Sequence, residues 1–301
     1  MNYFQLFSIS YMTNSVMSEL PYYGLSNTEL QKQLTNDRLS MMFDNNEFVD
    51  YLNNLNSSCL LKELNFQYVT EEQLTAKLKK LDRNIELSVF HMNIRSLNSK
   101  QRQICQLFEL LDYEFDVIIL TEIWTVNINF YANLFTGYDF YYDLPQDSKV
   151  GGVGLFIRNT CTVHELPQYQ ILSTRTSVVE NKWVEVTKES RKYIIGGIYR
   201  HPNQNIADFT SLLEPVLNSI SDQKLPCIIA GDINIDLTKS RVNENTSRYV
   251  DSLLTNNFLP TVLMPTRITP SSATLIDHMY YFDGCGSQNK VAQSGNLLAD
   301  I

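Results

Sequence analysis

Cys227-Ile-Ile-Ala-Gly-Asp-Ile-Asn-Ile-Asp-Leu237 is the stretch of sequence that decides the expected fold. Residues 227–230 are small or apolar, which is typical of a short strand buried on both faces. Period-2 alternation then places Asp232 and Asn234 on one face. A carboxylate and a carboxamide at a strand end can accept a proton from water and position a phosphate oxygen. The competing interpretation is an ordinary strand that enters an Asx turn.

A second polar strand end is predicted upstream. Residues 87–94 alternate like a strand and contain Asn93, residues 99–111 carry apolar side chains at helical spacing, and residues 116–120 form an apolar strand before Glu122. A strand, a helix and a strand within about 35 residues form a βαβ unit, whose parallel strands end at the same edge of a sheet. Asn93 and Glu122 are therefore expected to lie close together.

Glu122 has two interpretations. A glutamate after a strand is commonly a solvated or helix-capping residue. The apolar run 118–120 that precedes it favours a paired or functional charge instead. Mg²⁺ keeps several of its waters and needs few protein ligands, so one carboxylate with amide oxygens nearby is enough to hold it.

The rest of the C-terminal part predicts an antiparallel meander, then two helices and further strands. The glycine-rich run 151–158 lacks the spacing of phosphate-binding and dinucleotide-binding loops and is predicted as a strand. Strands are also predicted at 177–187, 193–199 and 273–282, and helices at 207–220 and around 247–255.

Three side chains of these later segments remain ambiguous. Tyr199 is either an aromatic residue at the sheet edge or a hydrogen-bond donor to a phosphate oxygen. His201, which precedes a proline, is interpreted as a loop residue. His278 points away from Asp277 by strand alternation and is interpreted as structural.

Composition and charge limit the function further. The chain has 301 residues, 44% of them hydrophobic and 19% charged, as in a globular protein. Its five cysteines show no paired spacing, which favours a reducing, intracellular setting, nuclear or cytoplasmic, and no signal peptide or membrane span is recognised. The net charge is −9, and residues 85–301 alone carry 17 Lys and Arg against 23 Asp and Glu, net −6. Binding of nucleic acid must therefore be local, use metal ions, or depend on a basic segment elsewhere.

Residues 1–84 differ in composition and periodicity from the residues that follow. They are rich in Asn, Leu, Ser and Gln and show weak helical patterns at 27–35, 46–55 and 71–81. We interpret residues 1–84 as a helical or partly disordered N-terminal leader and residues 85–301 as the functional domain.

Six motifs occur in an order that resembles the endonuclease/exonuclease/phosphatase superfamily. They are Phe90-His-Met-Asn-Ile-Arg-Ser-Leu97, Leu120-Thr-Glu-Ile-Trp124, Gly152-Val-Gly-Leu-Phe-Ile157, Ile198-Tyr-Arg-His-Pro202, Gly231-Asp-Ile-Asn234 and Thr274-Leu-Ile-Asp-His278. The first and last resemble endonuclease domains of non-LTR retrotransposons. The resemblance implies an α/β fold, a four-layer α/β/β/α sandwich of two packed mixed sheets, with the site where strand ends of both sheets meet.

The resemblance also implies roles for residues. Glu122 would hold Mg²⁺, or Mn²⁺ in its place, with Asn93 near the metal or the scissile phosphate. Tyr199 would orient the phosphate, Asp232 with Asn234 would activate and position the attacking water, and Asp277 would orient a histidine. Contacts to the backbone of double-stranded DNA are expected from Arg95, Arg200, Thr266 (with Thr269 as the alternative) and Arg267.

The implied reaction is metal-assisted hydrolysis of a phosphodiester, which nicks DNA and leaves a 3′ hydroxyl from which a downstream reverse transcriptase would start. One departure is that members end in a Ser-Asp-His motif, whereas the sequence given ends at Leu297-Leu-Ala-Asp-Ile301. We therefore expect a C-terminally truncated domain with impaired activity. The alternatives are a non-catalytic retroelement remnant and a phosphatase of the same superfamily that acts on inositol or sphingolipid phosphates.

Overall fold

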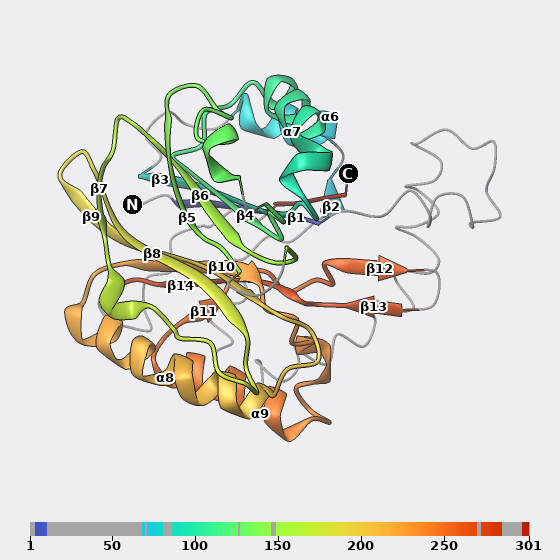
Figure 1. The fold of residues 1–301 in the computed structure, drawn as a ribbon, viewed down its shortest axis with the longest axis vertical. Helices are drawn as coiled ribbons and strands as arrows, with labels where there is room; N and C mark the ends of the chain where they lie inside the picture. The colour runs from blue at the N-terminus through green and yellow to red at the C-terminus, as the bar shows by residue number, and fades with distance from the viewer. Residues whose placement is uncertain are drawn as a thin grey trace.

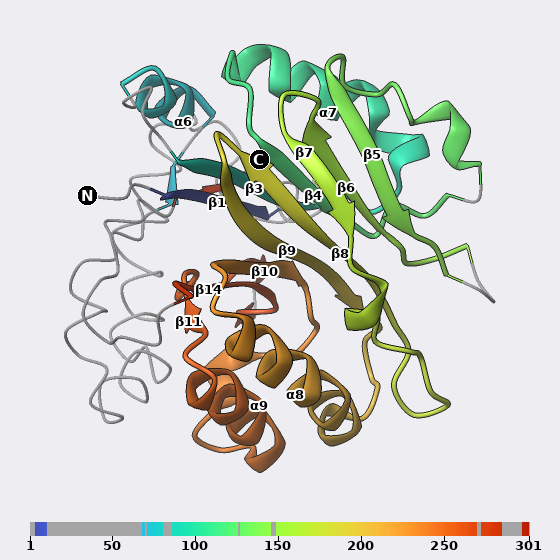
Figure 2. The same ribbon diagram turned by 90° about the vertical axis from the view of Figure 1, so that its left-hand side faces the viewer.

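The computed structural model describes residues 4–10, 68–69, 71–80, 86–125, 127–145, 149–269, 272–284 and 297–300. The described residues form two packed mixed sheets with helices on both outer faces (Figures 1 and 2). The predicted α/β/β/α arrangement is confirmed. The described part of the chain contains no helix that is long and apolar enough to span a membrane.

The first sheet contains seven strands of the described chain in the order β2-β15-β1-β3-β4-β6-β5. Strands β1, β3 and β4 are parallel, and β6 pairs antiparallel with β4 and β5. The strands are β1 (Phe4–Ser10), β2 (Tyr68–Val69), β3 (Leu87–Asn93), β4 (Val117–Thr121), β5 (Tyr138–Asp143), β6 (Val153–Arg158) and β15 (Leu297–Asp300).

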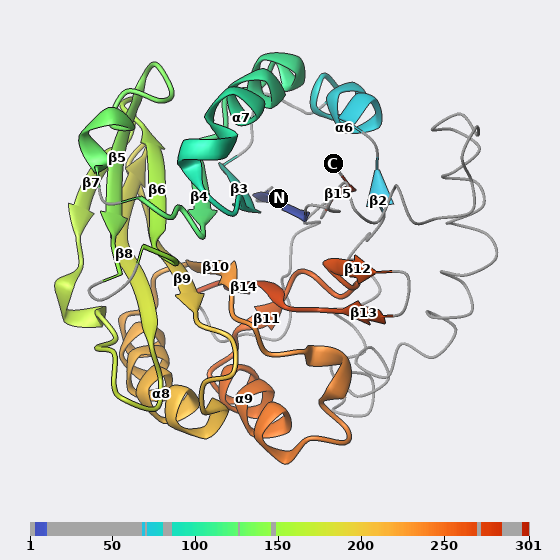
Figure 3. The ribbon, with the colours of Figure 1, turned by 45° about the vertical axis from the view of Figure 1, so that its right-hand side comes forward.

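The second sheet contains six strands of the described chain in the order β11-β14-β10-β9-β8-β7. It is antiparallel except between β9 and β10. The strands are β7 (Thr162–Glu165), β8 (Val179–Lys188), β9 (Arg191–Arg200), β10 (Cys227–Asp232), β11 (Leu259–Pro260) and β14 (Asp277–Phe282). A separate hairpin of β12 (Arg267–Thr269) and β13 (Ser272–Thr274) extends beside this sheet (Figure 3).

The helices cover the outer faces of the sheets. Helices α6 (Glu71–Leu78) and α7 (Leu97–Leu111) lie over the first sheet, and α8 (Ile206–Gln223) and α9 (Glu244–Thr255) lie under the second (Figure 2). Three of these helices begin with an asparagine or serine cap whose side chain accepts a backbone N–H: Ser96, Asn205 and Asn243.

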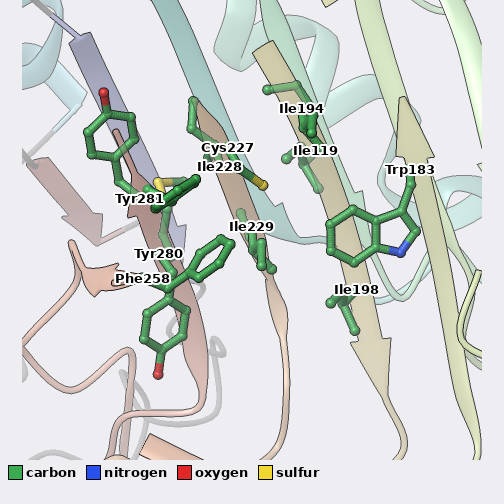
Figure 4. Close-up of a cluster of buried hydrophobic side chains, with 14 of the residues drawn as sticks. Ile119, Trp183, Ile194, Ile198, Cys227, Ile228, Ile229, Phe258, Tyr280 and Tyr281 are labelled. Carbon is green, nitrogen blue, oxygen red and sulfur yellow. The ribbon is translucent and has the colours of Figure 1, made fainter. Parts of the chain in front are cut away.

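Strand alternation produces two apolar cores. In β4, Val117 and Ile119 belong to the large core that includes both sheets and α8 and α9, whereas Ile118 and Leu120 pack in a second core with α6 and α7. Figure 4 shows part of the large core, with Ile119 of β4, Trp183 of β8 and isoleucines of β9 and β10. Burial of these faces against each other is the main stabilising term of the sandwich.

Two features differ from the sequence analysis. Strand β1 occurs within residues 1–84, which were expected to form a helical leader, although α6 matches the helix predicted at 71–81. The strand predicted at 273–282 is divided into β13 and β14. The division follows from Leu275, whose N–H donates to Asp236 Oδ1 (3.1 Å) and whose carbonyl accepts from the N–H of Leu237 (3.0 Å), so that the chain leaves one sheet before it joins the next. The helices predicted at 27–35 and 46–55 lie outside the described residues.

Candidate active site

Asn93 connects the two sheets at the candidate site. It is the last residue of β3, and its Nδ2 donates to Glu122 Oε1 at 2.7 Å and to Asp232 Oδ2 at 2.5 Å. Glu122 follows β4 in the first sheet, whereas Asp232 ends β10 in the second. The strand-helix-strand unit therefore brings Asn93 and Glu122 together as predicted, and the packing of the sheets adds Asp232.

The backbone turns sharply after both acidic strand ends. Glu122 has φ 55° and Asn234 has φ 52°, in the left-handed region that side chains other than glycine seldom adopt. The carbonyl of Glu122 accepts the N–H of Ser96 at 2.7 Å, which fixes the turn against the start of α7. A non-glycine residue in this region costs on the order of 1 kcal/mol, and such strain is concentrated at functional sites.

Asn234 does not share a strand face with Asp232, in contrast to the prediction. The strand ends at Asp232, so alternation does not extend to Asn234. Its backbone N–H donates to Asp232 Oδ1 at 3.2 Å, and its side-chain Nδ2 donates to the carbonyl of Arg200 at 2.8 Å. Asn234 thus holds the Asp232 carboxylate through its main chain, while its half-buried side chain keeps Oδ1 as an acceptor.

Three carboxylates crowd the site. Asp277, the first residue of β14, is the register partner of Asp232, and both are buried. Burial raises the pKa of Asp232 well above its usual range, and the charges of Asp277 and Glu122 raise it further. The N–H groups of Asn234 and Asn93 act in the opposite direction because they stabilise the ionised form.

Tyr199 completes this group from β9. It is buried, and burial together with the carboxylates of Glu122, Asp232 and Glu180 raises the pKa of its phenol. The phenol therefore stays protonated and keeps its hydrogen-bond donor. A protonated phenol beside carboxylates suits a site that binds a phosphate oxygen.

Thr266 supports Asp277. Its Oγ1 accepts the backbone N–H of Asp277 at 3.0 Å and that of Ile276 at 3.3 Å, and the residue is only 5% exposed. This position at the base of the β12–β13 hairpin fixes the start of β14. The expected contact with a DNA backbone does not fit the buried hydroxyl.

The three arginines that were expected to contact DNA have different surroundings. Arg200 is 1% exposed, and its guanidinium donates to main-chain carbonyls, including that of Gln204 at 2.7 Å. It therefore braces the loops next to the site, and the prediction of a DNA contact does not fit it. Arg267 is exposed at the start of β12, and Arg95 is half-buried two residues after Asn93.

Two of the four histidines are structural. His278 is buried, with Nδ1 against Tyr249 OH (3.1 Å) and Nε2 against the carbonyl of Ile235 (2.9 Å), as predicted for a residue that faces away from the site. Burial lowers its pKa to about 4 and that of His91 to about 3. Both rings are therefore neutral at physiological pH.

A hydrogen-bonded contact between His201 and Glu180 lies beside Tyr199 and was missed by the sequence analysis. His201 Nε2 lies 3.0 and 3.1 Å from the two carboxylate oxygens of Glu180. Glu180 lies in β8 directly opposite Tyr199. Glu180 and His201 lie 21 positions apart, a separation that no local spacing rule relates, and the polar composition of β8 gave no signal for their contact.

The oxygen donors fit a hard divalent cation. Mg²⁺ prefers carboxylate oxygens and few protein ligands, and Glu122 and Asp232 present carboxylates across the junction of the sheets. Asn93 Oδ1 accepts the N–H of Arg95 (3.2 Å). The Nδ2 group of Asn93, a hydrogen-bond donor, therefore points toward the carboxylates. In this orientation Asn93 holds the two carboxylates together through Nδ2, and its expected role as a metal ligand stays a prediction. Within the described residues, no group of three or more His, Cys, Asp and Glu side chains is arranged to hold a metal ion.

A cavity of about 1080 Å³ lies away from these residues. It is lined at the starts of β3 and β4 by Ser88 and Asp116, together with Lys188 and residues of α7. Asp116 Oδ2 accepts hydrogen bonds there from Ser88 N (2.8 Å) and Lys188 Nζ (2.9 Å). The cavity contains none of the candidate catalytic side chains.

The fold and the site define an α/β sandwich with an acidic centre at the junction of its two sheets. The model of the Endonuclease/Exonuclease/phosphatase family matches residues 90–292, and the chain belongs to this family. The superfamily inferred from the six motifs is thus confirmed. Members of the family are hydrolases that act on phosphodiesters or phosphate monoesters.

Three solved structures are similar to the chain. The endonuclease domain of TRAS1, a telomere-specific non-LTR retrotransposon, is 15% identical, with 64% of this chain and 82% of that chain covered and a TM-score of 0.47. The mannosyl-6-phosphatase Bt3783 of Bacteroides thetaiotaomicron is 14% identical, with 64% and 84% covered and a TM-score of 0.47. TDP2 of D. rerio, complexed with a single-strand DNA product, is 15% identical, with 64% and 82% covered and a TM-score of 0.45. A comparison with curated proteins found no match.

Proposed function

We propose that the chain is a Mg²⁺-dependent endonuclease that hydrolyses a phosphodiester of double-stranded DNA, of the kind found in non-LTR retrotransposons. The observation that carries the proposal is the bridge from Asn93 to Glu122 and Asp232, because it assembles a carboxylate site at the junction of the two sheets. The forms of the motifs at residues 93–97 and 274–278 favour the retrotransposon class. In such an element, the partner of the domain would be a reverse transcriptase.

Each side chain has a defined task in this proposal. Asp232 accepts the proton of the attacking water, and Asn234 holds the carboxylate with its N–H and positions the water with Oδ1. Tyr199 donates its phenol hydrogen to a phosphate oxygen. Bound Mg²⁺ would be held by Glu122 and would polarise a phosphate oxygen. Burial, together with the charges of Asp277 and Glu122, raises the pKa of Asp232, and a bound cation would offset the repulsion among these carboxylates.

An extended substrate can reach the site between two basic positions. Arg95 lies beside Asn93, and Arg267 begins the β12–β13 hairpin, which is anchored to the site through the bond from Asp277 N to Thr266. Contacts from arginines to phosphates position a duplex without reading its sequence. We therefore propose Arg95 and Arg267 as the phosphate contacts on either side of the site.

Cleavage assays on three substrates test the proposed function. We expect nicking of supercoiled plasmid in Mg²⁺ and no nicking in EDTA, with little release of phosphate from phosphoinositide vesicles or from a sugar phosphate. We expect this preference for DNA because only a polymer is long enough to contact both Arg95 and Arg267. Release of phosphate from monoesters without nicking would favour the phosphatase alternative, and inactivity on every substrate would favour a non-catalytic remnant.

The metal assignment has a readout that is independent of activity. Mg²⁺ at millimolar concentration is expected to raise the melting temperature, because a ligand that binds only the native state stabilises it by mass action. Glu122→Gln should abolish this gain, since it removes the carboxylate proposed to hold the ion. Glu214→Gln, on the exposed face of α8, is the matched control and should keep the gain. A melting temperature of the unmodified chain that does not respond to Mg²⁺ would contradict the assignment.

A further inference from the structure

His201 lies next to the candidate catalytic phenol and has no task in the reaction described above. It follows Tyr199 by two residues and lies on the same side of the extended chain. The two rings have centroids 4.9 Å apart and an interplanar angle of 63°. His201 therefore borders the position at which Tyr199 would meet a phosphate.

Glu180 fixes the orientation of this imidazole. Its carboxylate is buried and contacts His201 Nε2 with both oxygens, and it also accepts the N–H of Gly152 at 3.3 Å. The backbone of His201 is tied to the same strand region through its N–H, which donates to the carbonyl of Val178 at 3.1 Å. Both the ring and the main chain of His201 are therefore held in place.

Gly151 allows the neighbouring loop to pack over the contact between His201 and Glu180. A Cβ at residue 151 would lie 2.8 Å from Glu180 Oε2 and 2.9 Å from His201 Nε2, and Gly151 has φ +116°, a conformation open to glycine. The carbonyl of Gly151 accepts the N–H of Trp124, two residues after Glu122. The loop that covers the His201–Glu180 pair is thus connected to the turn that carries Glu122.

The second nitrogen of His201 remains for a ligand. None of the hydrogen bonds among the described residues involves its Nδ1, and the side chain is 19% exposed. A protonated imidazole with Nε2–H on a carboxylate keeps Nδ1–H as a charged donor, and such donors bind phosphate oxygens strongly. Glu180 thus orients the ring so that Nδ1, in the protonated imidazole, can donate to a phosphate oxygen at the rim of the acidic site.

We propose that His201, oriented by Glu180, contacts the phosphate next to the scissile one in the substrate. The proposal rests on the proposed DNA-cleaving function. Two residues along a strand correspond to about 6.6 Å, so His201 reaches beyond the phosphate held by Tyr199. His201 is then a substrate-contacting residue, and Glu180 is a positioning residue.

A pair of substrates that differ in the number of phosphates tests the inference. Bis(p-nitrophenyl) phosphate has one phosphodiester and no neighbour, whereas DNA has both. His201→Ala is expected to raise KM for a DNA duplex about tenfold with kcat nearly unchanged, since it removes one charged hydrogen bond. It should leave the hydrolysis of bis(p-nitrophenyl) phosphate unchanged.

Two further variants separate contact from folding. His201→Gln keeps a donor for Glu180 but has no second nitrogen, so it should show the same loss on DNA alone. Glu180→Gln keeps the shape of the side chain, removes its charge, and should raise KM for DNA in the same direction. Equal losses on both substrates, or no loss on DNA, would overturn the inference. An unmodified chain that hydrolyses bis(p-nitrophenyl) phosphate but not DNA would overturn the proposed endonuclease function, and the inference with it, while the membership in the family would stand.

Discussion

Asp232→Asn is expected to lower the rate of phosphodiester hydrolysis by about 10²- to 10⁴-fold, the range in which a general base contributes. Asparagine fills the same volume and can still accept the N–H of Asn234, but it cannot take a proton from water. The single-turnover rate on plasmid DNA in saturating Mg²⁺ measures the effect. Asp222→Asn, an exposed change of the same kind at the end of α8, should keep the full rate.

The same substitution is expected to stabilise the fold in EDTA. The pKa of Asp232 is higher in the native state than in the unfolded chain, where it is about 3.9. The native state therefore holds this proton more tightly, and ionisation destabilises the fold as pH rises from the unfolded value toward the native one. Asparagine copies the protonated form and removes this penalty, which grows as the pH rises above the unfolded pKa until the native pKa is reached. The melting temperature should thus rise at pH 7 and stay nearly the same near pH 3.

These two readouts check each other. A variant that loses activity and gains stability places Asp232 in a crowded acidic centre that is maintained for function. Loss of activity together with loss of stability at pH 7 would instead show that the carboxylate is needed to hold the turn at Asn234. Unchanged hydrolysis would contradict the role of Asp232 as the base.

Local patterns were sufficient to predict the parts of the site that depend on parallel strands. Apolar runs and helical spacing between residues 87 and 120 predicted that Asn93 and Glu122 share a sheet edge, and their side chains are 2.7 Å apart. Alternation also predicted that His278 faces away from the site. These predictions use only the fixed geometry of strands, helices and right-handed crossovers.

Other parts depended on contacts between strand ends and loops of the second sheet and could not be predicted in this way. Arg200 resembles a surface cation in the sequence, but carbonyls of two loops enclose its guanidinium. Asn234 does not follow the alternation of strand side chains because its backbone adopts a left-handed conformation. The bond from Glu180 to His201 joins separate strands. Tertiary packing decides such details and overrides local periodicity.

Gly231→Ala is expected to destabilise the protein by more than about 3 kcal/mol, because the added methyl group would meet main chain that cannot move aside by changing rotamer. A Cβ at residue 231 would lie 1.7 Å from the carbonyl oxygen of Ile198 and 2.7 Å from its carbonyl carbon. Urea unfolding of the two proteins measures the difference in free energy. Gly137→Ala is the control, because a Cβ there meets nothing within 4 Å and only the positive φ of 83° is unfavourable, at about 1–2 kcal/mol.

The close approach at Gly231 also links stability to the site. Gly231 precedes Asp232 in β10, and Ile198 precedes Tyr199 in the neighbouring strand β9. The main chains of β9 and β10 approach closely at this point, and Tyr199 lies near enough to Asp232 that the charge of this carboxylate adds to burial and to Glu122 in raising the pKa of the phenol. If Gly231→Ala folds after relaxation of the strands, it should therefore hydrolyse DNA more slowly than Gly137→Ala does. Equal stability and equal rates for the two variants would show that β9 and β10 are further apart at this point than the contact with Ile198 requires.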